Sequence, residues 1–154
     1  MLEDVQDPGN AGSLIRTAAA LGYNGVIMSD KCADPFSPKV VQSTAGSLLS
    51  VWIRRNGGYL QMAAQLKNEG YELICADLRG EESLNFKYSG SHMLALGSEG
   101  SGISKELLEL GSRAVRIPIE KSCAESLNVA AAGAILMFIC SRSPESHQGL
   151  RAKG

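Results

Sequence analysis

Short aliphatic runs alternate with helix-forming stretches along most of this 154-residue chain, and this alternation restricts the possible folds more than any other feature. Such alternation favours an α/β fold, in which a parallel sheet is flanked by helices. The expected strands are Gly25–Met28, Ser50–Ile53, Tyr71–Ala76, His92–Leu96 and Ala114–Pro118, with a first strand within Met1–Val5. The expected helices are Ser13–Leu21, Pro38–Gly46, Tyr59–Asn68, Ser104–Leu110 and Leu127–Ser141.

The length and composition indicate one globular domain. Apolar residues make up 44% of the chain and charged residues 20%, which is typical of a globular protein. We expect the domain to span residues 1–141, followed by a polar, aperiodic tail at 142–154. The formal net charge of −1 does not predict nucleic-acid binding. Any contact with RNA would therefore come from local patches, a partner protomer or a further domain.

The cysteines and histidines do not form a metal-binding pattern. The four cysteines occur singly, at Cys32, Cys75, Cys123 and Cys140. Neither His92 nor His147 lies at metal-ligand spacing from them. We therefore expect buried thiols in a reducing cytoplasm and no metal. The longest apolar run, Val129–Cys140, is shorter than the roughly 20 residues that span a bilayer, so we expect no membrane segment.

The first of three chemically suggestive segments is Asp7–Arg16. A proline and two glycines predict a tight turn, and a helix follows with Leu14, Ala18 and Leu21 on its apolar face. Arg16 lies off that face and in the first turn of the expected helix. A cation there opposes the helix dipole by about 0.3–1 kcal/mol, but free N–H groups beside a guanidinium suit a phosphate. A solvent-exposed arginine without a role is the alternative.

The second segment, Leu96–Ser104, is a glycine-rich loop that follows an expected strand and precedes an expected helix. Ligands of open α/β sheets bind at the carboxyl ends of strands, and three glycines allow the backbone to approach a ligand closely. The glycine order matches neither a dinucleotide fingerprint nor a P-loop. The alternative is an ordinary strand-to-helix turn in which Glu99 is simply exposed.

The third segment runs from Ile117 to Ala132 and leads into a helix that is apolar on every side. Such a helix is buried, either in the core or against a second subunit. Ser126 could be the N-cap of this helix. Asn128 would be a polar amide in the first turn of a buried helix, and it must find hydrogen-bond partners.

Together, these segments resemble the three sequence motifs of the SpoU (TrmH-like) branch of the SPOUT methyltransferases. The first motif is matched by Asn10, Gly12 and Arg16; the second by Gly97, Glu99, Gly100 and Gly102; the third by Ser126 to Val129. The resemblance covers nearly the whole chain, from about Leu2 to Ser141. The loop between Pro118 and Ser126 departs from the family pattern, because it is one residue longer and lacks a glycine.

The resemblance implies a fold and an activity. It implies a parallel sheet with a trefoil knot near the C-terminus, which general topology rules would not predict. It implies a homodimer with active sites at the interface, and methyl transfer from S-adenosylmethionine (AdoMet) to a ribose 2′-hydroxyl of rRNA or tRNA. The implied catalytic residues are Arg16, Asn10, Glu99, Ser126 and Asn128. The implied cofactor-binding residues are Leu96, Gly97, Gly100, Ile117, Ile119, Ser126, Leu127 and Ala132.

Arg16 is expected to bind the RNA phosphate and the attacking hydroxyl, because a guanidinium stays protonated and is a poor base. Two other functions remain open. A dinucleotide-dependent oxidoreductase would need the glycine fingerprint that is missing here. A non-catalytic RNA-binding module would not need Arg16, Glu99 and Asn128 together.

Overall fold

The computed structural model describes residues 1–85, 90–120, 122 and 125–141. The expected tail, Cys123 and His147 lie outside these residues. The strands are β1 (Gly25–Met28), β2 (Trp52–Arg55), β3 (Glu72–Glu82), β4 (His92–Ala95) and β5 (Arg113–Arg116). The α-helices are α1 (Pro8–Ala20), α2 (Pro38–Ser43), α3 (Tyr59–Asn68), α4 (Lys105–Leu110) and α5 (Val129–Ser141), and short 3₁₀ turns lie at Ser47–Ser50 and Ser83–Asn85.

All strand pairs are parallel, as expected for this α/β pattern. One sheet has the order β1-β2 and the other the order β4-β3-β5. Leu2 joins them through parallel bridges to Met28 and Leu96. The segment expected to contain a first strand therefore lies between β1 and β4, so that the carboxyl ends of all the strands share one edge.

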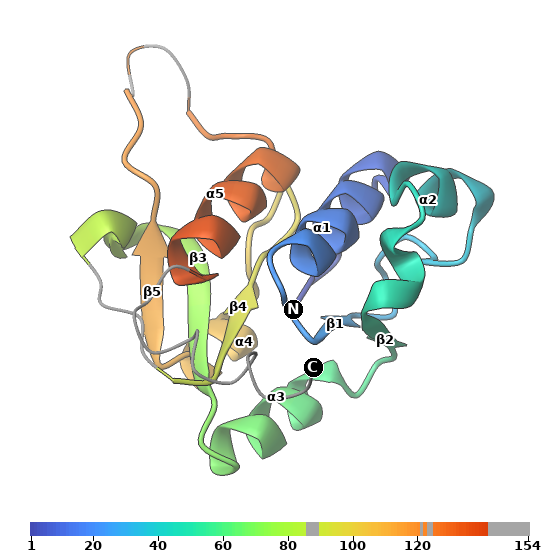
Figure 1. Cartoon of the computed structure of the whole chain (residues 1–154). Helices are drawn as coiled ribbons and strands as arrows, with labels where there is room; N and C mark the ends of the chain where they lie inside the picture. The colour runs from blue at the N-terminus through green and yellow to red at the C-terminus, as the bar shows by residue number, and fades with distance from the viewer. Residues whose placement is uncertain (86–89, 121, 123–124, 142–154) are drawn as a thin grey trace, which may run out of the picture.

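Helices cover both faces of the sheet (Figure 1). On one face, Leu14 of α1 and Leu136 of α5 pack with Ile74 and Leu94 of the sheet. On the other face, α3 and α4 contribute small and aliphatic side chains that pack against the alternate residues of β3 and β4. This alternation along β3 and β4 is what a two-sided sheet requires. The knot implied by the resemblance stays a prediction.

Helix α1 begins earlier than predicted. Asp7 is its N-cap, because the Asp7 carboxylate accepts a hydrogen bond of 2.8 Å from the Asn10 N–H, and Pro8 is the first helical residue. The expected start at Ser13 was therefore wrong. Gly12 does not interrupt α1 but lets α2 approach, since a Cβ at Gly12 would lie 2.4 Å from Ser43 Cβ. Arg16 is consequently in the third turn, where the helix N-terminus gives it no phosphate site.

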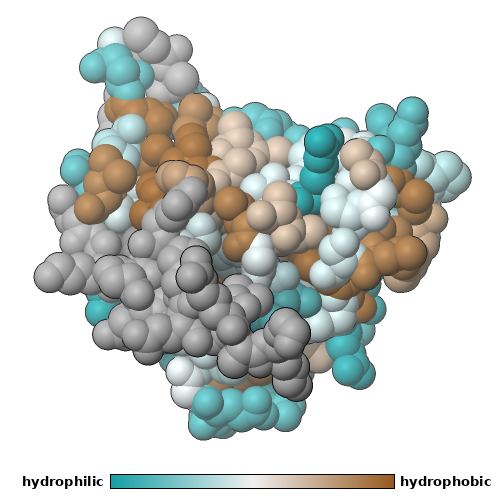
Figure 2. Space-filling model, viewed as in Figure 1, coloured by the Kyte–Doolittle hydropathy of each residue, from teal (hydrophilic) through white to brown (hydrophobic). Residues whose placement is uncertain are grey.

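Helix α5 has one buried face and one exposed face. Gly133 is buried, and a Cβ there would lie 2.3 Å from Leu14 Cδ2, so glycine allows α5 to pack closely on α1. On the other face, Ile135 and Phe138 are 39% and 47% exposed. Figure 2 shows hydrophobic surface in the part of the view where Figure 1 places α5. The helix thus packs in the core and also presents an apolar surface.

Several predicted boundaries were wrong for local reasons. Strand β3 continues past Ala76 to Glu82, with an irregular register against β5 between Ala76 and Glu81. Helix α2 ends at Ser43, because Ala45 and Gly46 take positive φ angles of 48° and 88°. The next strand begins later than predicted, at Trp52, because a 3₁₀ turn precedes it.

A buried carboxylate fixes the N-terminal segment beside α3 and α4. Glu3 is 3% exposed and accepts hydrogen bonds from the Tyr59 hydroxyl at 2.5 Å and from the Ser104 N–H and hydroxyl, both at 2.6 Å. Burial raises the pKa of the Tyr59 hydroxyl, and the bond to Glu3 raises it further. Buried charge is tolerated here because it is fully hydrogen-bonded. This network holds the neighbouring Asp4 in place at the edge of the sheet.

The described residues contain neither a helix suited to cross a membrane nor a cluster suited to hold a metal ion. No helix among them is both long enough and apolar enough to cross a membrane. Within the same residues, no group of three or more His, Cys, Asp or Glu side chains is placed to hold a metal ion.

Candidate active site

The glycine-rich loop after β4 folds into a tight ring with Glu99 in it. Ser98 pairs with Gly102 in an antiparallel bridge, and the Gly102 N–H donates to the Ser98 carbonyl at 3.0 Å. A Cβ at Gly97 would lie 2.1 Å from the Gly102 backbone, and Gly102 has a φ of +68°. Glycine is therefore required at both ends of the ring for different reasons, crowding at Gly97 and backbone conformation at Gly102.

Glu99 is the point at which the three motifs meet. Its Oε1 accepts hydrogen bonds from Asn10 Nδ2 at 3.1 Å, from Asn128 Nδ2 at 2.5 Å and from the Val129 N–H at 3.4 Å. Asn128 Nδ2 also donates to Asn10 Oδ1 at 3.1 Å. Residues from the start of α1, the loop after β4 and the start of α5 thus form one hydrogen-bonded cluster.

Asn128 has two functions in this cluster. Its Oδ1 accepts from the Ala130 and Ala131 N–H groups at 3.0 and 3.3 Å, which caps α5. Its Nδ2 donates to the Asn10 and Glu99 side chains. The prediction that Asn128 must find partners is confirmed, whereas the suggestion that Ser126 caps this helix was wrong, because α5 begins only at Val129. The Glu99 carboxylate lies at the α5 N-terminus, where the helix dipole favours a negative charge.

A hollow of about 510 Å³ opens beside the cluster. Its lining includes the side chains of Asp4, Asp7, Asn10 and Glu99, with the residues Val5, Gln6, Ser98, Gly100, Ser101 and Val129. None of the described residues that line it is Lys or Arg. Three carboxylates without a lining cation favour a cationic or neutral ligand over a phosphate.

The sequence did not indicate Asp4 as a site residue. Asp4 has a φ of +54°, an uncommon conformation for a residue other than glycine. Its N–H donates to Ser29 Oγ at 2.9 Å, and its carboxylate accepts from the same hydroxyl at 2.7 Å and lies 3.6 Å from Lys31 Nζ. Both partners are at least 25 residues away in the chain, so no local pattern could identify this arrangement.

Two predicted catalytic residues are not part of the cluster within one protomer. Arg16 is exposed and, among the residues described, its side chain makes no hydrogen bond or ion pair. It is six residues beyond Asn10, about 9 Å along the helix axis and about 120° around it. Ser126 is also exposed and forms no side-chain hydrogen bond within the described part of the chain.

The comparison with known families agrees with this arrangement of motifs. The profile described as the SpoU rRNA Methylase family matches residues 1–138. The chain belongs to this family.

Curated SpoU relatives include enzymes with named RNA targets. The chain is 38% identical over 141 residues to the 23S rRNA (guanosine(2553)-2′-O)-methyltransferase RlmP of Bacillus subtilis, covering 90% of this chain and 55% of the relative. It is 33% identical over 137 residues to the 23S rRNA (uridine(2479)-2′-O)-methyltransferase of Streptomyces viridochromogenes, covering 85% and 47%. The chain spans about half the length of these relatives.

Solved structures of SpoU relatives share the fold. The AdoMet-bound rRNA methyltransferase from Sinorhizobium meliloti superposes with a TM-score of 0.84 and 33% identity, covering 92% of this chain and 54% of that one. The SpoU methyltransferase AviRb from Streptomyces viridochromogenes, in complex with AdoMet, gives a TM-score of 0.82 and 32% identity, with 92% and 55% covered. AdoMet is the methyl donor of the family.

The predicted cofactor residues lie where the topology allows a common site. Leu96 and Gly97 follow β4 while Ile117 and Ile119 follow β5, and these strands flank β3 in the same orientation. Leu96 is buried; Ile117, Ile119 and Ala132 are half-buried; Gly100, Ser126 and Leu127 are exposed.

These residues fit AdoMet chemically. Leu96, Ile119 and Ala132 would form the predicted apolar walls, and a Cβ at Gly100 would meet nothing within 4 Å, which leaves open space beside its backbone. The neighbouring Glu99 carboxylate would favour the positive sulfonium. Residues 121, 123 and 124 of the atypical loop lie outside the described structure, and the individual contacts stay a prediction.

Proposed function

We propose that this chain is the catalytic domain of an enzyme that transfers a methyl group from AdoMet to a ribose 2′-hydroxyl of rRNA or tRNA. The observation that carries the proposal is the Glu99 cluster, which joins Asn10, Glu99 and Asn128 from three separate motifs. The two curated relatives described above are named as 2′-O-methyltransferases of rRNA. An rRNA or tRNA substrate would place the reaction in the cytoplasm.

The chain's own residues must orient the hydroxyl and bind its phosphate. When bound, AdoMet supplies an electrophilic methyl group whose departure from sulfur leaves a neutral thioether, so no acid is needed for the leaving group. The task left to the protein is to position a hydroxyl that must lose its proton. Asn10 and Asn128 hold the Glu99 carboxylate at the hollow, while Arg16 would bind phosphate and hydroxyl outside the acidic hollow through its planar guanidinium.

A homodimer would reconcile the separation of Arg16 from Glu99. Ala131 and Ile135 form an exposed apolar stripe on α5, and α5 packs beside α1, which carries Arg16 (Figure 1). We propose that two protomers pair across this α1/α5 surface by two-fold symmetry, so that Arg16 of one protomer completes the site of its partner. Sedimentation velocity at micromolar concentration should show a dimer, and a monomer would contradict the shared site.

Two alternative functions have less support. A dinucleotide-binding domain is not favoured, because the loop after β4 closes into a ring with a different glycine order. A non-catalytic RNA-binding module would not require a carboxylate held by two amides beside a hollow.

Cofactor binding and RNA methylation can each be measured to test the proposed function. Isothermal titration should show that the chain binds AdoMet and its demethylated product, and NADH should give no heat. Mapping of 2′-O-methyl groups in cellular RNA with and without the gene should then reveal a lost modification. Methylation of a base instead of a ribose would contradict the proposed specificity, and binding of NADH without AdoMet would favour the dinucleotide alternative.

A further inference from the structure

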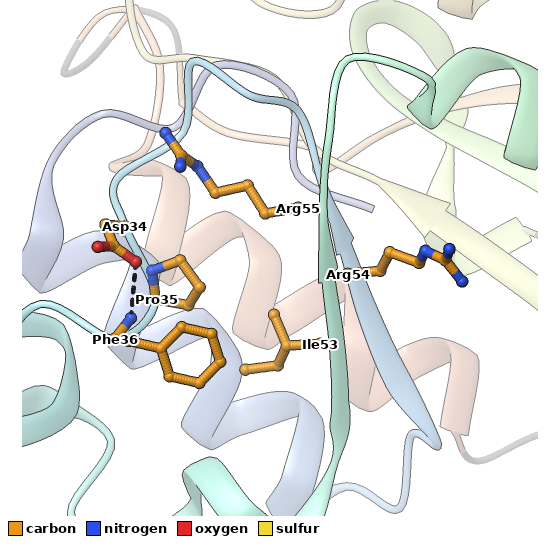
Figure 3. A pocket seen from close by; sticks show the side chains of 6 residues that line it. All are labelled: Asp34, Pro35, Phe36, Ile53, Arg54 and Arg55. Atoms are coloured by element: carbon orange, nitrogen blue, oxygen red, sulfur yellow. Dashed lines mark hydrogen bonds between the residues drawn. The ribbon is translucent and has the colours of Figure 1, made fainter.

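A second hollow, of about 490 Å³, lies at the carboxyl ends of β1 and β2 (Figure 3). It is lined by Asp34, Pro35, Phe36, Ile53, Arg54 and Arg55. None of these residues lines the Glu99 hollow, and none belongs to the three motifs. The hollow therefore has no explanation in the methyl-transfer site described above.

Phe36 is held in an exposed position by its own loop. It is 68% exposed, although the preceding Pro35 is buried. The Asp34 carboxylate accepts from the Phe36 N–H at 3.0 Å, and the Asp34 carbonyl accepts from the Ser37 N–H at 3.1 Å and hydroxyl at 2.8 Å. The Phe36 ring and the Ile53 side chain face one another across the hollow (Figure 3). Because these bonds fix the loop backbone that carries Phe36, little backbone entropy is lost when a ligand binds to the ring.

Among the described residues, neither arginine of the hollow is paired with a carboxylate. Arg55 Nε donates to the Cys32 carbonyl at 3.2 Å and Nη2 donates to the Asp30 carbonyl, so both partners are neutral backbone groups. Arg54 extends from the other side of β2 (Figure 3) and, within the described residues, its guanidinium has no hydrogen bond or ion pair. Residues 30–55 carry a net charge of +2, whereas the whole chain carries −1.

We propose that this hollow binds an unpaired nucleotide of an RNA strand, with the base stacked on Phe36, its phosphate beside Arg55, and a further phosphate of the same strand beside Arg54 on the other side of β2. Exposed aromatic rings next to arginines are the features that bind single-stranded RNA. A duplex keeps its bases stacked inside and offers none to Phe36. A purely apolar protein segment would fill the space between Phe36 and Ile53 but would offer no anion to the two arginine charges.

The position of the hollow agrees with this occupant. The Ala33 N–H, next to Asp34, donates to the Val5 carbonyl at 2.9 Å, and Val5 lines the Glu99 hollow. The segments that line the two hollows are therefore directly hydrogen-bonded to each other, and one RNA strand would run from the methyl-transfer site to Phe36. The inference rests on the proposed function for the identity of the ligand as RNA.

The experiment measures binding of the full chain to a short, unstructured, fluorescein-labelled RNA by anisotropy, alone and paired with its complement. Phe36→Ala and Phe36→Leu should weaken binding of the single strand by about 5- to 150-fold, the ~1–3 kcal/mol of one stacked base. Phe36→Tyr should retain binding, because it keeps the ring. The matched control is Leu49→Ala, which removes an apolar side chain that is 93% exposed and does not line the hollow.

Arg54→Ala tests the phosphate contact. It should lower the slope of log affinity against log salt by about 0.7, the value for one phosphate contact to a single strand. The control is Lys105→Ala, since Lys105 is 85% exposed on α4 and pairs with Glu109. Equal effects of Arg54→Ala and Lys105→Ala would show a general charge effect and overturn this part of the proposal.

The outcomes separate this inference from the proposed function. Unchanged binding by Phe36→Ala, retained binding by Phe36→Leu, or no binding of the wild-type chain to the single strand overturns the hollow as an RNA site. Each of these leaves AdoMet binding, measured on the same proteins, as an independent test of the methyltransferase. Loss of RNA binding by Phe36→Ala in a chain that does not bind AdoMet would support the hollow and contradict the proposed function.

Discussion

Substitutions can distinguish the two roles of the Asn128 side chain, the capping of α5 by Oδ1 and the hydrogen bond from Nδ2 to Glu99. Asn128→Ala removes both the cap on α5 and the donor to Glu99. Asn128→Ser keeps a capping oxygen but cannot reach Glu99 with an amide. Asn128→Asp also keeps the cap, but places a second carboxylate where Nδ2 now lies 2.5 Å from Glu99 Oε1.

The expected magnitudes follow from these contacts. Loss of the cap costs about 1 kcal/mol of unfolding free energy. Loss of the hydrogen bond to the Glu99 carboxylate adds about 1.5 kcal/mol, the low end for a charged acceptor, because both residues are exposed. We therefore expect Asn128→Ala to lose about 2–3 kcal/mol and Asn128→Ser about half of that. Asn128→Asp should lose ~1–2 kcal/mol more than Asn128→Ser, because two carboxylates about 3 Å apart repel one another in a largely aqueous environment.

The loss in Asn128→Asp should depend on pH. Repulsion raises the pKa of the paired carboxyls in the folded state above their unfolded values, so the cost is present at neutral pH. It should disappear as the pH falls below about 4, where the carboxyls are protonated. Urea unfolding at both pH values measures the difference from wild type, and methyl transfer to RNA measures the effect on the site. Equal stability of Asn128→Ala and Asn128→Ser would refute the capping role, and wild-type methyl transfer by Asn128→Ser would refute the positioning of Glu99.

Three further predictions concern other parts of the site and its support. Arg16→Ala should change the unfolding free energy by less than about 0.5 kcal/mol, because the side chain is exposed. It should nevertheless lower methyl transfer by about 10²-fold, and Arg16→Lys should restore little of this activity. Intact activity of Arg16→Ala would exclude Arg16 from the mechanism. Gly97→Ala should disrupt the ring and weaken AdoMet binding in a calorimetric titration, whereas Gly100→Ala, whose Cβ meets nothing within 4 Å, should fold and be as stable as wild type. The wild-type chain should lose stability as the pH rises above about 10, since the Tyr59 pKa is raised in the folded state. Urea unfolding of Tyr59→Phe should show a smaller loss of unfolding free energy with pH. An equal pH dependence in both proteins would show that Tyr59 is not the group responsible.

The sequence predicted elements well where periodicity and end signals agreed. The bounds of β1 and α3 match the expected ranges, because each aliphatic or helical pattern ends at a clear polar or glycine signal. The start of α1 was missed because the apolar face begins at Leu14, while the Asp7-Pro8 capping pair lies almost two turns earlier. The segment around Leu2 pairs through only a few residues, and its position between β1 and β4 depends on contacts distant in sequence.

The candidate site was predictable in part. The three motifs follow strands or precede helices whose ends meet at one edge of a parallel sheet, so the cluster of Asn10, Glu99 and Asn128 could be expected. Its detailed geometry could not, because it depends on a glycine ring closed by crowding at Gly97. In the proposed homodimer, the place of Arg16 relative to this cluster depends on the second protomer, about which periodicity within one chain carries no information.

The hydrogen bonds to Glu99 explain why two amides accompany this carboxylate. All three donors converge on Oε1, and within the described residues Oε2 accepts no hydrogen bond. A carboxylate held through one oxygen keeps the other in a fixed direction at the wall of the hollow, where it can accept a hydroxyl or face a cation. Asn10 and Asn128 suit this task because both lie at helix starts: the Asn10 backbone N–H donates to the Asp7 carboxylate that caps α1, and Asn128 Oδ1 caps α5. Their side-chain amides therefore fix Glu99 relative to the starts of both helices. A shift of α5 on α1 would therefore move Glu99 Oε2, which accepts no hydrogen bond within the described residues and would face the substrate in the proposed reaction.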